Sequence, residues 1–207
     1  MSASLPSSYF DAVYAASDDP WAFESSAYEA DKYADTIGAL GTRTYRRAFE
    51  IGCSIGVLTR LLAGHCEQLL AVDVNDHALD TARRRCADLP QVEFQRIQLP
   101  GEFPHGHFDL IVMSEVGYYW SRPDLERALG RIDDALYPGG HLLLVHWTPP
   151  VADYPLGGDD VHECALARAA QAGRVRPLNG WRRATYRLDL LERASSDGAW
   201  RASPEAP

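Results

Sequence analysis

The sequence has few cysteines, and none of them stands in a C-x-x-C pair. Their spacings match no zinc ribbon, so we expect no metal site. A chain of 207 residues buries a sufficient core without cross-links, which excludes a disulfide-stapled miniprotein. We therefore expect four reduced thiols in a reducing compartment. The cysteines are Cys53, Cys66, Cys86 and Cys164.

Long hydrophobic runs and early basic residues are also missing. No Lys or Arg precedes Lys32, so the N-terminus does not resemble a signal peptide. The longest apolar runs, such as 142–145, are far too short to span a bilayer. The 20 basic residues are outnumbered by 29 acidic ones, and a net charge of -9 repels the phosphates of nucleic acid. We expect a soluble, cytoplasmic protein without a membrane or nucleic-acid partner.

Short apolar runs alternate with helical patterns through the middle of the chain. This β-α-β-α alternation predicts an α/β fold with a doubly wound, mostly parallel sheet covered by helices on both faces. A turn is expected at 137–140, and 180–193 suits one or two further strands. The strands are predicted at 48–51, 69–74, 92–97, 108–114 and 141–147, and the helices at 57–63, 78–87, 123–136 and 161–172.

The two ends of the chain differ in composition from this middle part. Residues 1–17 are rich in Ser and Ala and are expected to be disordered, as is the polar tail at 195–207. A single domain is predicted over 18–194. It begins with a lid helix at 18–41 and has a short irregular cap after the fifth strand.

The strongest local signal is F-E-I-G-C-S-I-G-V-L at residues 49–58. A strand ends in an acid, and a loop of small residues opens a helix whose free N–H groups face a bound ligand. Gly52 allows the backbone to approach a ligand closely, and Gly56 allows the helix to pack on the strand. The spacing G-x-x-x-G differs from the dinucleotide fingerprint G-x-G-x-x-G, which argues against a rival function, a nicotinamide-dependent oxidoreductase.

Other predicted strands bring polar residues to the same edge of the sheet. Asp73 lies at the end of the second strand, where an acid can accept both hydroxyls of a ribose. The third strand ends near Gln98 and Leu99, where an adenine edge would be read, and the fourth ends at Ser114 and Glu115. Ligands of open α/β sheets bind over the carboxyl ends of the strands, so these residues are predicted to share one crevice.

Four motifs in order, E-I-G-C-S-I-G, V-D-V-N-D, F-D-L-I-V-M-S-E-V and Y-P-G-G-H-L, resemble the class I S-adenosylmethionine-dependent methyltransferases. Segments 18–32 and 115–119 are similar to those of the nodulation protein S (NodS)-like N-methyltransferases. The resemblance implies a Rossmann-like fold and methyl transfer to an amine of a small polar molecule, with an amino sugar as one acceptor. The alternatives are an O-methyltransferase of a small metabolite and a non-catalytic cofactor-binding subunit.

The resemblance also implies a set of cofactor contacts. Trp21 and Lys32 would close over S-adenosylmethionine, with Lys32 pairing its carboxylate. Gln98 stands where many relatives carry an aspartate for the adenine amino group, and its carbonyl can still accept that hydrogen bond. The expected cofactor-binding residues are Trp21, Lys32, Glu50, Gly52, Cys53, Ser54, Gly56, Asp73, Val74, Gln98, Leu99 and Ser114.

Candidates for the chemistry follow the fourth and fifth predicted strands. Methyl transfer from a sulfonium is an in-line displacement, so the protein mainly aligns the acceptor lone pair with the methyl group. An acceptor amine must be neutral when it attacks, which a nearby base favours. We expect Glu115, Tyr118 and His162 to be catalytic. Their structural alternatives are a helix start, core packing and a helix cap, and His146 is interpreted as a core histidine.

Overall fold

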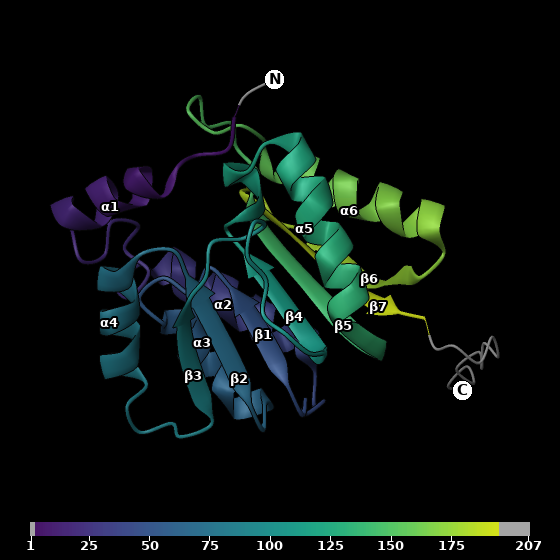
Figure 1. Cartoon of the computed structure of the whole chain (residues 1–207), viewed down its shortest axis with the longest axis horizontal. Helices are drawn as coiled ribbons and strands as arrows, with labels where there is room; N and C mark the ends of the chain where they lie inside the picture. The colour runs from purple at the N-terminus through teal and green to yellow at the C-terminus, as the bar shows by residue number, and fades with distance from the viewer. Residues whose placement is uncertain (1–2, 195–207) are drawn as a thin grey trace.

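A single sheet of seven strands organises the chain, whose computed structural model describes residues 3–194 (Figure 1). The strand order is β3-β2-β1-β4-β5-β7-β6, with β1 to β5 parallel and β7 antiparallel to both of its neighbours. The predicted α/β fold with a mostly parallel sheet is confirmed. The strands are Ala48–Ile51 (β1), Leu69–Asp73 (β2), Val92–Arg96 (β3), Phe108–Ser114 (β4), Leu136–Trp147 (β5), Val175–Arg182 (β6) and Tyr186–Arg193 (β7).

Helices cover both faces of this sheet. In Figure 1, α5 and α6 lie on one face, and α2 and α3 lie on the other. Two short 3-10 helices, η1 (Ala63–His65) and η2 (Gly117–Tyr119), complete the fold. The α-helices are Ser7–Ala16 (α1), Ala27–Leu40 (α2), Val57–Leu62 (α3), Asp76–Arg85 (α4), Arg122–Ala135 (α5) and Gly158–Ala172 (α6).

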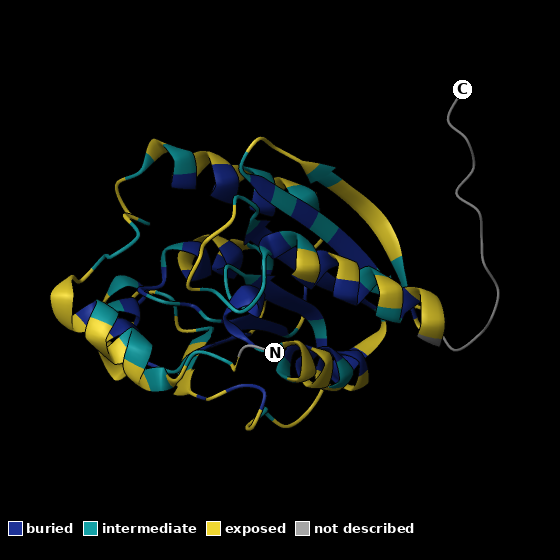
Figure 2. Ribbon diagram, turned by 90° about the horizontal axis from the view of Figure 1, so that it is seen from above, coloured by how far each residue is buried: buried dark blue, intermediate teal, exposed yellow. Residues whose placement is uncertain are grey.

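The central strands are apolar on both sides because both sides are covered. Successive side chains of a strand point to opposite faces. In β4, Ile111 and Met113 therefore join the core beneath α5 and α6, while Leu110 and Val112 join the core beneath α2 and α3. Figure 2 shows the buried centre and the exposed outer sides of the helices. Among residues 3–194, no helix has the length and apolar character that crossing a membrane requires.

The expectation of a disordered segment at 1–17 is wrong for its described part, which contains α1. Two aromatic side chains, one helical turn apart, anchor this helix. Phe10 packs edge-on against Tyr119 with ring centroids 5.0 Å apart, and Tyr14 packs edge-on against Trp21 at 5.6 Å. The Ser- and Ala-rich composition conceals this aromatic face. The predicted disordered tail at 195–207 lies outside the described residues.

The predicted lid helix at 18–41 begins later than expected, at Ala27. The Asp19 carboxylate accepts hydrogen bonds from the backbone N–H groups of Phe23 and Glu24 and so forms a turn before the helix. Ser26 then caps α2 by accepting from the Glu29 N–H group. Trp21 consequently lies in the preceding turn, not on the helix.

The turn predicted at 137–140 is part of β5 instead. The pairing of β4 with β5 runs from Phe108–Leu136 directly to Leu110–His141, so the intervening residues of β5 form a bulge. Tyr137 is 49% exposed there. Turn-forming residues at 138–140 therefore serve a bulge that keeps β5 in register with β4.

Replacing Gly56 with Ala should destabilise the fold through the contact of α3 with α4. Gly56 has φ +79°, and an added Cβ would lie 2.9 Å from the Ala82 Cβ and 3.0 Å from its Cα. Gly41 has φ +60° with no atom within 4 Å of the added Cβ, which makes Gly41→Ala the matched control for backbone strain. We expect urea unfolding to show a loss of about 1–2 kcal/mol for the control and about 1–3 kcal/mol more for Gly56→Ala. Equal losses would show that Ala82 moves away from the added methyl group without a measurable cost in stability.

Candidate functional site

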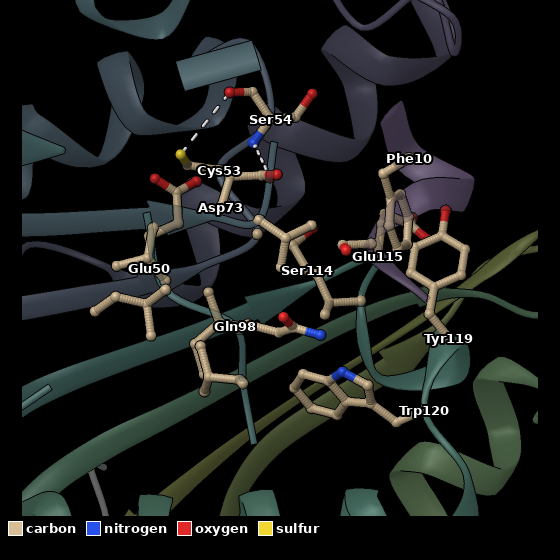
Figure 3. Close-up of a pocket in the computed structure, with 18 of the residues that line it drawn as sticks. Phe10, Glu50, Cys53, Ser54, Asp73, Gln98, Ser114, Glu115, Tyr119 and Trp120 are labelled. Atoms are coloured by element: carbon tan, nitrogen blue, oxygen red, sulfur yellow. Dashed lines mark hydrogen bonds between the residues drawn. The ribbon is translucent and has the colours of Figure 1, made fainter. Parts of the chain in front are cut away.

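A cavity of about 390 Å³ lies over the carboxyl ends of β1, β2 and β4 (Figure 3). Sites for small molecules commonly measure about 300–1,000 Å³. Most of the expected cofactor residues line it, whereas Lys32 and Gly56 lie outside it. Gly56 serves the contact between α3 and α4, not the helix–strand packing expected from the sequence. The expected residues that line the cavity are Trp21, Glu50, Gly52, Cys53, Ser54, Asp73, Val74, Gln98, Leu99 and Ser114.

The loop between β1 and α3 forms one wall of the cavity. Gly52 and Cys53 donate their backbone N–H groups to the Val72 carbonyl at 2.8 and 2.9 Å, which ties the loop to the end of β2. Gly52 has φ +75°, and an added Cβ would meet the Val116 side chain at 2.1 Å. A glycine is required here because the segment after β4 packs directly on this loop.

Asp73 is held in place by the backbone on both sides. Its Oδ2 accepts from the Ser54 N–H group at 2.9 Å, and its Oδ1 accepts from the Asn75 N–H group at 3.0 Å. Burial raises the pKa of Asp73, and the backbone N–H groups that it binds act in the opposite direction. The carboxylate is therefore fixed at the carboxyl end of β2, and its remaining lone pairs can accept hydrogen bonds from a ligand.

Glu50 brings a buried carboxyl group to the same wall. Glu50 is 2% exposed, and its Oε2 atom has no hydrogen-bond partner among the described residues. Burial raises the pKa of Glu50 to about 7, and the nearby Thr59 side chain acts in the opposite direction. An unpartnered buried acceptor is costly, and a cationic or N–H donor group on a ligand would satisfy it. In Figure 3, Glu50 and Asp73 lie on the side opposite Phe10 and Tyr119.

Aromatic side chains form a further wall of this cavity, and most of them were not predicted from the sequence. Phe10 and Tyr14 come from α1, and Tyr119 and Trp120 come from η2 and the residue after it. The spacing of Phe10 and Tyr14 is the signal that could have revealed the first two, because residues four apart share a helix face. Tyr119 follows directly after Tyr118, the tyrosine that was expected to be catalytic.

A carboxylate also stands near Gln98, although the sequence analysis did not expect one. Glu102 accepts a hydrogen bond from the Gln98 backbone N–H group at 2.8 Å, and both residues line the cavity. Glu102 therefore places a second polar side chain, with a carboxyl group, beside Gln98 in the wall of the cavity.

Glu115 connects three parts of the chain through its carboxylate. Its Oε1 atom lies 2.6 Å from the Lys32 ammonium, and its Oε2 atom accepts from the Tyr118 hydroxyl at 2.5 Å and the Trp147 N–H group at 2.9 Å. The backbone of Glu115 has φ +58°, a left-handed conformation that non-glycine residues rarely adopt. Such strain is typical of functional segments.

Lys32 lies elsewhere than the sequence analysis expected. It is the only lysine of the sequence, it is 2% exposed, and its ammonium also pairs with Glu29 at 2.9 Å. Burial lowers the pKa of Lys32, but the carboxylates of Glu115 and Glu29 outweigh it and raise the pKa overall. Its charge is therefore engaged within the protein, and the expected pairing with a cofactor carboxylate is not supported.

A second cavity, of about 310 Å³, adjoins the first. Trp21, Phe23, Glu115 and Tyr119 line both. The Glu29–Lys32–Glu115 cluster, with two carboxylates and one ammonium, lies on its wall. The other side chains around it are mostly aromatic and include Tyr28, Tyr118, Trp147 and Tyr154.

His162 lines neither cavity, so direct contact with a substrate, expected from the sequence, is not supported. It is fully buried, and its ring hydrogen-bonds to His146 at 3.1 Å and to Asp189 at 2.6 Å. The expectation that His146 is a core histidine agrees with its complete burial. Among the residues from 3 to 194, no group of three His, Cys, Asp or Glu side chains is arranged to hold a metal ion.

Replacing Lys32 with Met should strongly destabilise the protein. The change leaves Glu29 and Glu115 without their buried counter-ion, and breaking a buried ion pair in this way costs about 3–5 kcal/mol. Arg60→Met is the control, because it removes an ion pair with Asp88 in which the side chains are 44% and 64% exposed. We expect the control to leave the unfolding free energy in urea nearly unchanged. Equal effects of both changes would show that the buried cluster contributes no stability.

The sequence profile of the nodulation protein S (NodS) family matches residues 13–146. Nodulation protein S of Rhizobium tropici is 33% identical over 62% of this chain and 55% of its own length. The protein of the same name from Bradyrhizobium diazoefficiens is 36% identical over 49% of each chain. The chain thus spans about half the length of these curated relatives.

Many solved structures match over most of the chain, and two of them illustrate the likeness. The N-methyltransferase NodS from Bradyrhizobium japonicum WM9, in complex with S-adenosylhomocysteine, has a TM-score of 0.78 and 22% identity over 90% of this chain and 97% of its own. A putative methyltransferase from Pseudomonas syringae has a TM-score of 0.69 and 36% identity over 80% of this chain and 99% of its own. The predicted Rossmann-like class I methyltransferase fold is confirmed.

Proposed function

The chain belongs to the nodulation protein S (NodS) family, and we propose that it transfers a methyl group from S-adenosylmethionine to an amine of a small polar molecule. The observation that carries the proposal is a single cavity that joins the buried, unpartnered Glu50 oxygen to Asp73 at the strand ends. The solved NodS structure contains S-adenosylhomocysteine, the product that remains after methyl transfer. This supports S-adenosylmethionine as the cofactor.

The residues present fit this cofactor. Asp73 would accept hydrogen bonds from the ribose hydroxyls, and Glu50 would accept from the amino group of the methionine part. The loop at 52–54 would approach with its backbone, and Gln98 with Glu102 would bind the adenine. The bound cofactor supplies an electrophilic methyl group on a sulfonium.

We place the acceptor amine in the second cavity. The two carboxyl groups of Glu29 and Glu115 face the single ammonium of Lys32, and aromatic rings surround them, so the cavity attracts a protonated amine through charge and cation–π contacts. The bound amine must release a proton to solvent before its lone pair can attack the methyl group. Both Glu115 oxygens already accept hydrogen bonds, which makes this carboxylate a fixed acceptor that, with Tyr118, orients the amine. An amino sugar is the acceptor that the family resemblance favours. An alcohol acceptor would leave the negative charge uncompensated.

The remaining expectations stay predictions. A cytoplasmic location, and a small-molecule acceptor without nucleic-acid or membrane partners, rest on the sequence. The catalytic roles of Glu115 and Tyr118 rest on their position between the two cavities.

Asp73→Ala should weaken the binding of S-adenosylhomocysteine about tenfold or more. A hydrogen bond to a charged group contributes about 1.5–3 kcal/mol, and roughly 1.4 kcal/mol corresponds to a factor of ten. Asp76→Ala is the matched control, because its side chain is 75% exposed and lies outside the cavity. Calorimetric titration measures both affinities, with NADH as a ligand that should not bind. An unchanged affinity in Asp73→Ala would refute the cofactor assignment.

The same preparations test the transfer itself. Wild-type protein is incubated with S-adenosylmethionine and a panel of amines and amino sugars, with the matching alcohols as controls, and the formation of S-adenosylhomocysteine is followed. Turnover with amines alone supports the proposal, and turnover with alcohols alone supports the O-methyltransferase. Cofactor binding without turnover on any acceptor would favour a non-catalytic subunit.

The affinity for S-adenosylhomocysteine should fall as the pH drops below about 7, the pKa to which burial raises Glu50. The ammonium of the ligand favours the ionised carboxyl group, so a protonated Glu50 must release its proton on binding. Calorimetry near pH 6.5 (about half a unit below that pKa), in two buffers of different protonation enthalpy, should detect this release. Glu50→Gln should abolish the release and flatten the pH dependence. Retention of both in the variant would assign the proton to another group.

A further inference from the structure

Two fully buried histidines lie behind the segment 115–119, and the proposed function does not use them. His146 is on β5, and His162 is on α6. A chain of hydrogen bonds connects them to the backbone and to a carboxylate. Its links are Gly117 N to His146 Nε2 at 3.2 Å, His146 Nδ1 to His162 Nε2 at 3.1 Å, and His162 Nδ1 to Asp189 Oδ2 at 2.6 Å.

The backbone sets the direction of this chain. A neutral imidazole has one N–H group and one lone pair. The Gly117 N–H group can only donate, so His146 Nε2 must be the acceptor and His146 Nδ1 must carry the hydrogen. His146 then donates to His162 Nε2, and His162 Nδ1 donates to Asp189. Every link is satisfied only when both rings are neutral Nδ1–H tautomers.

The surroundings agree with two neutral rings. Burial lowers the pKa of both histidines. At His146, the positive charges of Lys32 and of a protonated His162 would lower the pKa further. At His162, the Asp189 carboxylate raises the pKa and so acts against the effect of burial. Asp189 also forms an ion pair with the Arg187 guanidinium, whose Nε atom lies 2.8 Å from the Asp189 Oδ2 atom. An added proton on either ring would set two N–H groups face to face and break a link.

The segment held by this chain is the one that carries Glu115 and Tyr118. The His146 ring packs edge-on against the Tyr118 ring with centroids 5.5 Å apart. Gly117 fits tightly, because an added Cβ would meet the Val161 side chain at 2.6 Å and His146 Nε2 at 3.2 Å. The position of Gly117 thus determines where the Tyr118 hydroxyl meets the Glu115 carboxylate.

We propose that His146 and His162 are positioning residues, which fix the segment 115–119 through the directional chain from Gly117 to Asp189 and so orient Glu115 and Tyr118 toward the acceptor. This role rests on the proposed methyl transfer. The hydrogen-bond chain itself does not, and it can be tested without any acceptor.

The first test is the tautomer of each histidine in the wild-type protein, read from ¹⁵N and ¹³C shifts of labelled imidazoles. Isolated neutral histidine favours the Nε2–H tautomer, so the Nδ1–H form at both His146 and His162 would support the proposal. The Nε2–H form or a charged ring at either position would overturn it. Failure of the proposed function leaves this readout unaffected.

The second test separates positioning from packing with two variants. In His146→Gln the side-chain amide can accept from Gly117 and donate to His162, whereas His146→Leu fills similar space without either bond. We expect His146→Leu to lose at least about tenfold in kcat through the unsatisfied Gly117 N–H group, and His146→Gln to keep kcat near the wild-type value. Both variants keep Glu50 and Asp73, but the segment 115–119 also borders the cofactor cavity. We therefore expect any loss of S-adenosylhomocysteine affinity in His146→Leu to be smaller than its loss in kcat, and His146→Gln to bind like the wild type.

Hydrogen exchange of the Gly117 amide completes the test. It should be slow in the wild type and in His146→Gln and fast in His146→Leu. Parallel losses of kcat, cofactor affinity and Gly117 protection in both variants would show a purely structural role and overturn the proposal. If the wild-type protein methylates no amine, the proposed function fails, and the tautomers with the Gly117 exchange still decide whether the chain exists.

Discussion

The carboxylate of Glu115 is the point on which the rest of the site depends. This one side chain binds the ammonium of Lys32 on α2, the backbone N–H group of Trp147 on β5 and the hydroxyl of Tyr118 in η2. These elements come from distant parts of the sequence and enclose the second cavity together. The left-handed backbone of Glu115 is tolerated because so many contacts determine its position.

The two cavities divide the proposed reaction between different parts of the fold. The parallel sheet supplies Glu50 and Asp73 at the ends of β1 and β2, where backbone hydrogen bonds make their positions rigid. The N-terminal helices and the segments after β4 and β5 supply the aromatic rings and the charged cluster. In the proposed reaction the cofactor would thus meet one wall set by the sheet and an aromatic wall set by α1 and η2, whereas the acceptor would meet a cavity set mostly by helices and loops.

Local patterns were sufficient to predict the sheet and the glycine loop, because strand alternation and G-x-x-x-G spacing act over a few residues. Such local patterns do not predict contacts between segments that are far apart in the sequence. Lys32 was interpreted as a cofactor contact, since nothing near it in the sequence reveals its partner Glu115. His162 was interpreted as catalytic for the same reason, because its partners His146 and Asp189 become neighbours only when α6 packs on the sheet. The role of α1 was concealed by its composition.

The burial of Lys32 has a consequence for the chemistry of the protein itself. A methyl donor held in a cavity is a hazard to every nucleophile nearby, and the amine of a lysine side chain is among the strongest. This chain has one such amine, and two carboxylates keep it protonated. Without a free lone pair it cannot attack an electrophile, so the same ion pairs that line the proposed acceptor cavity would also protect it from self-alkylation.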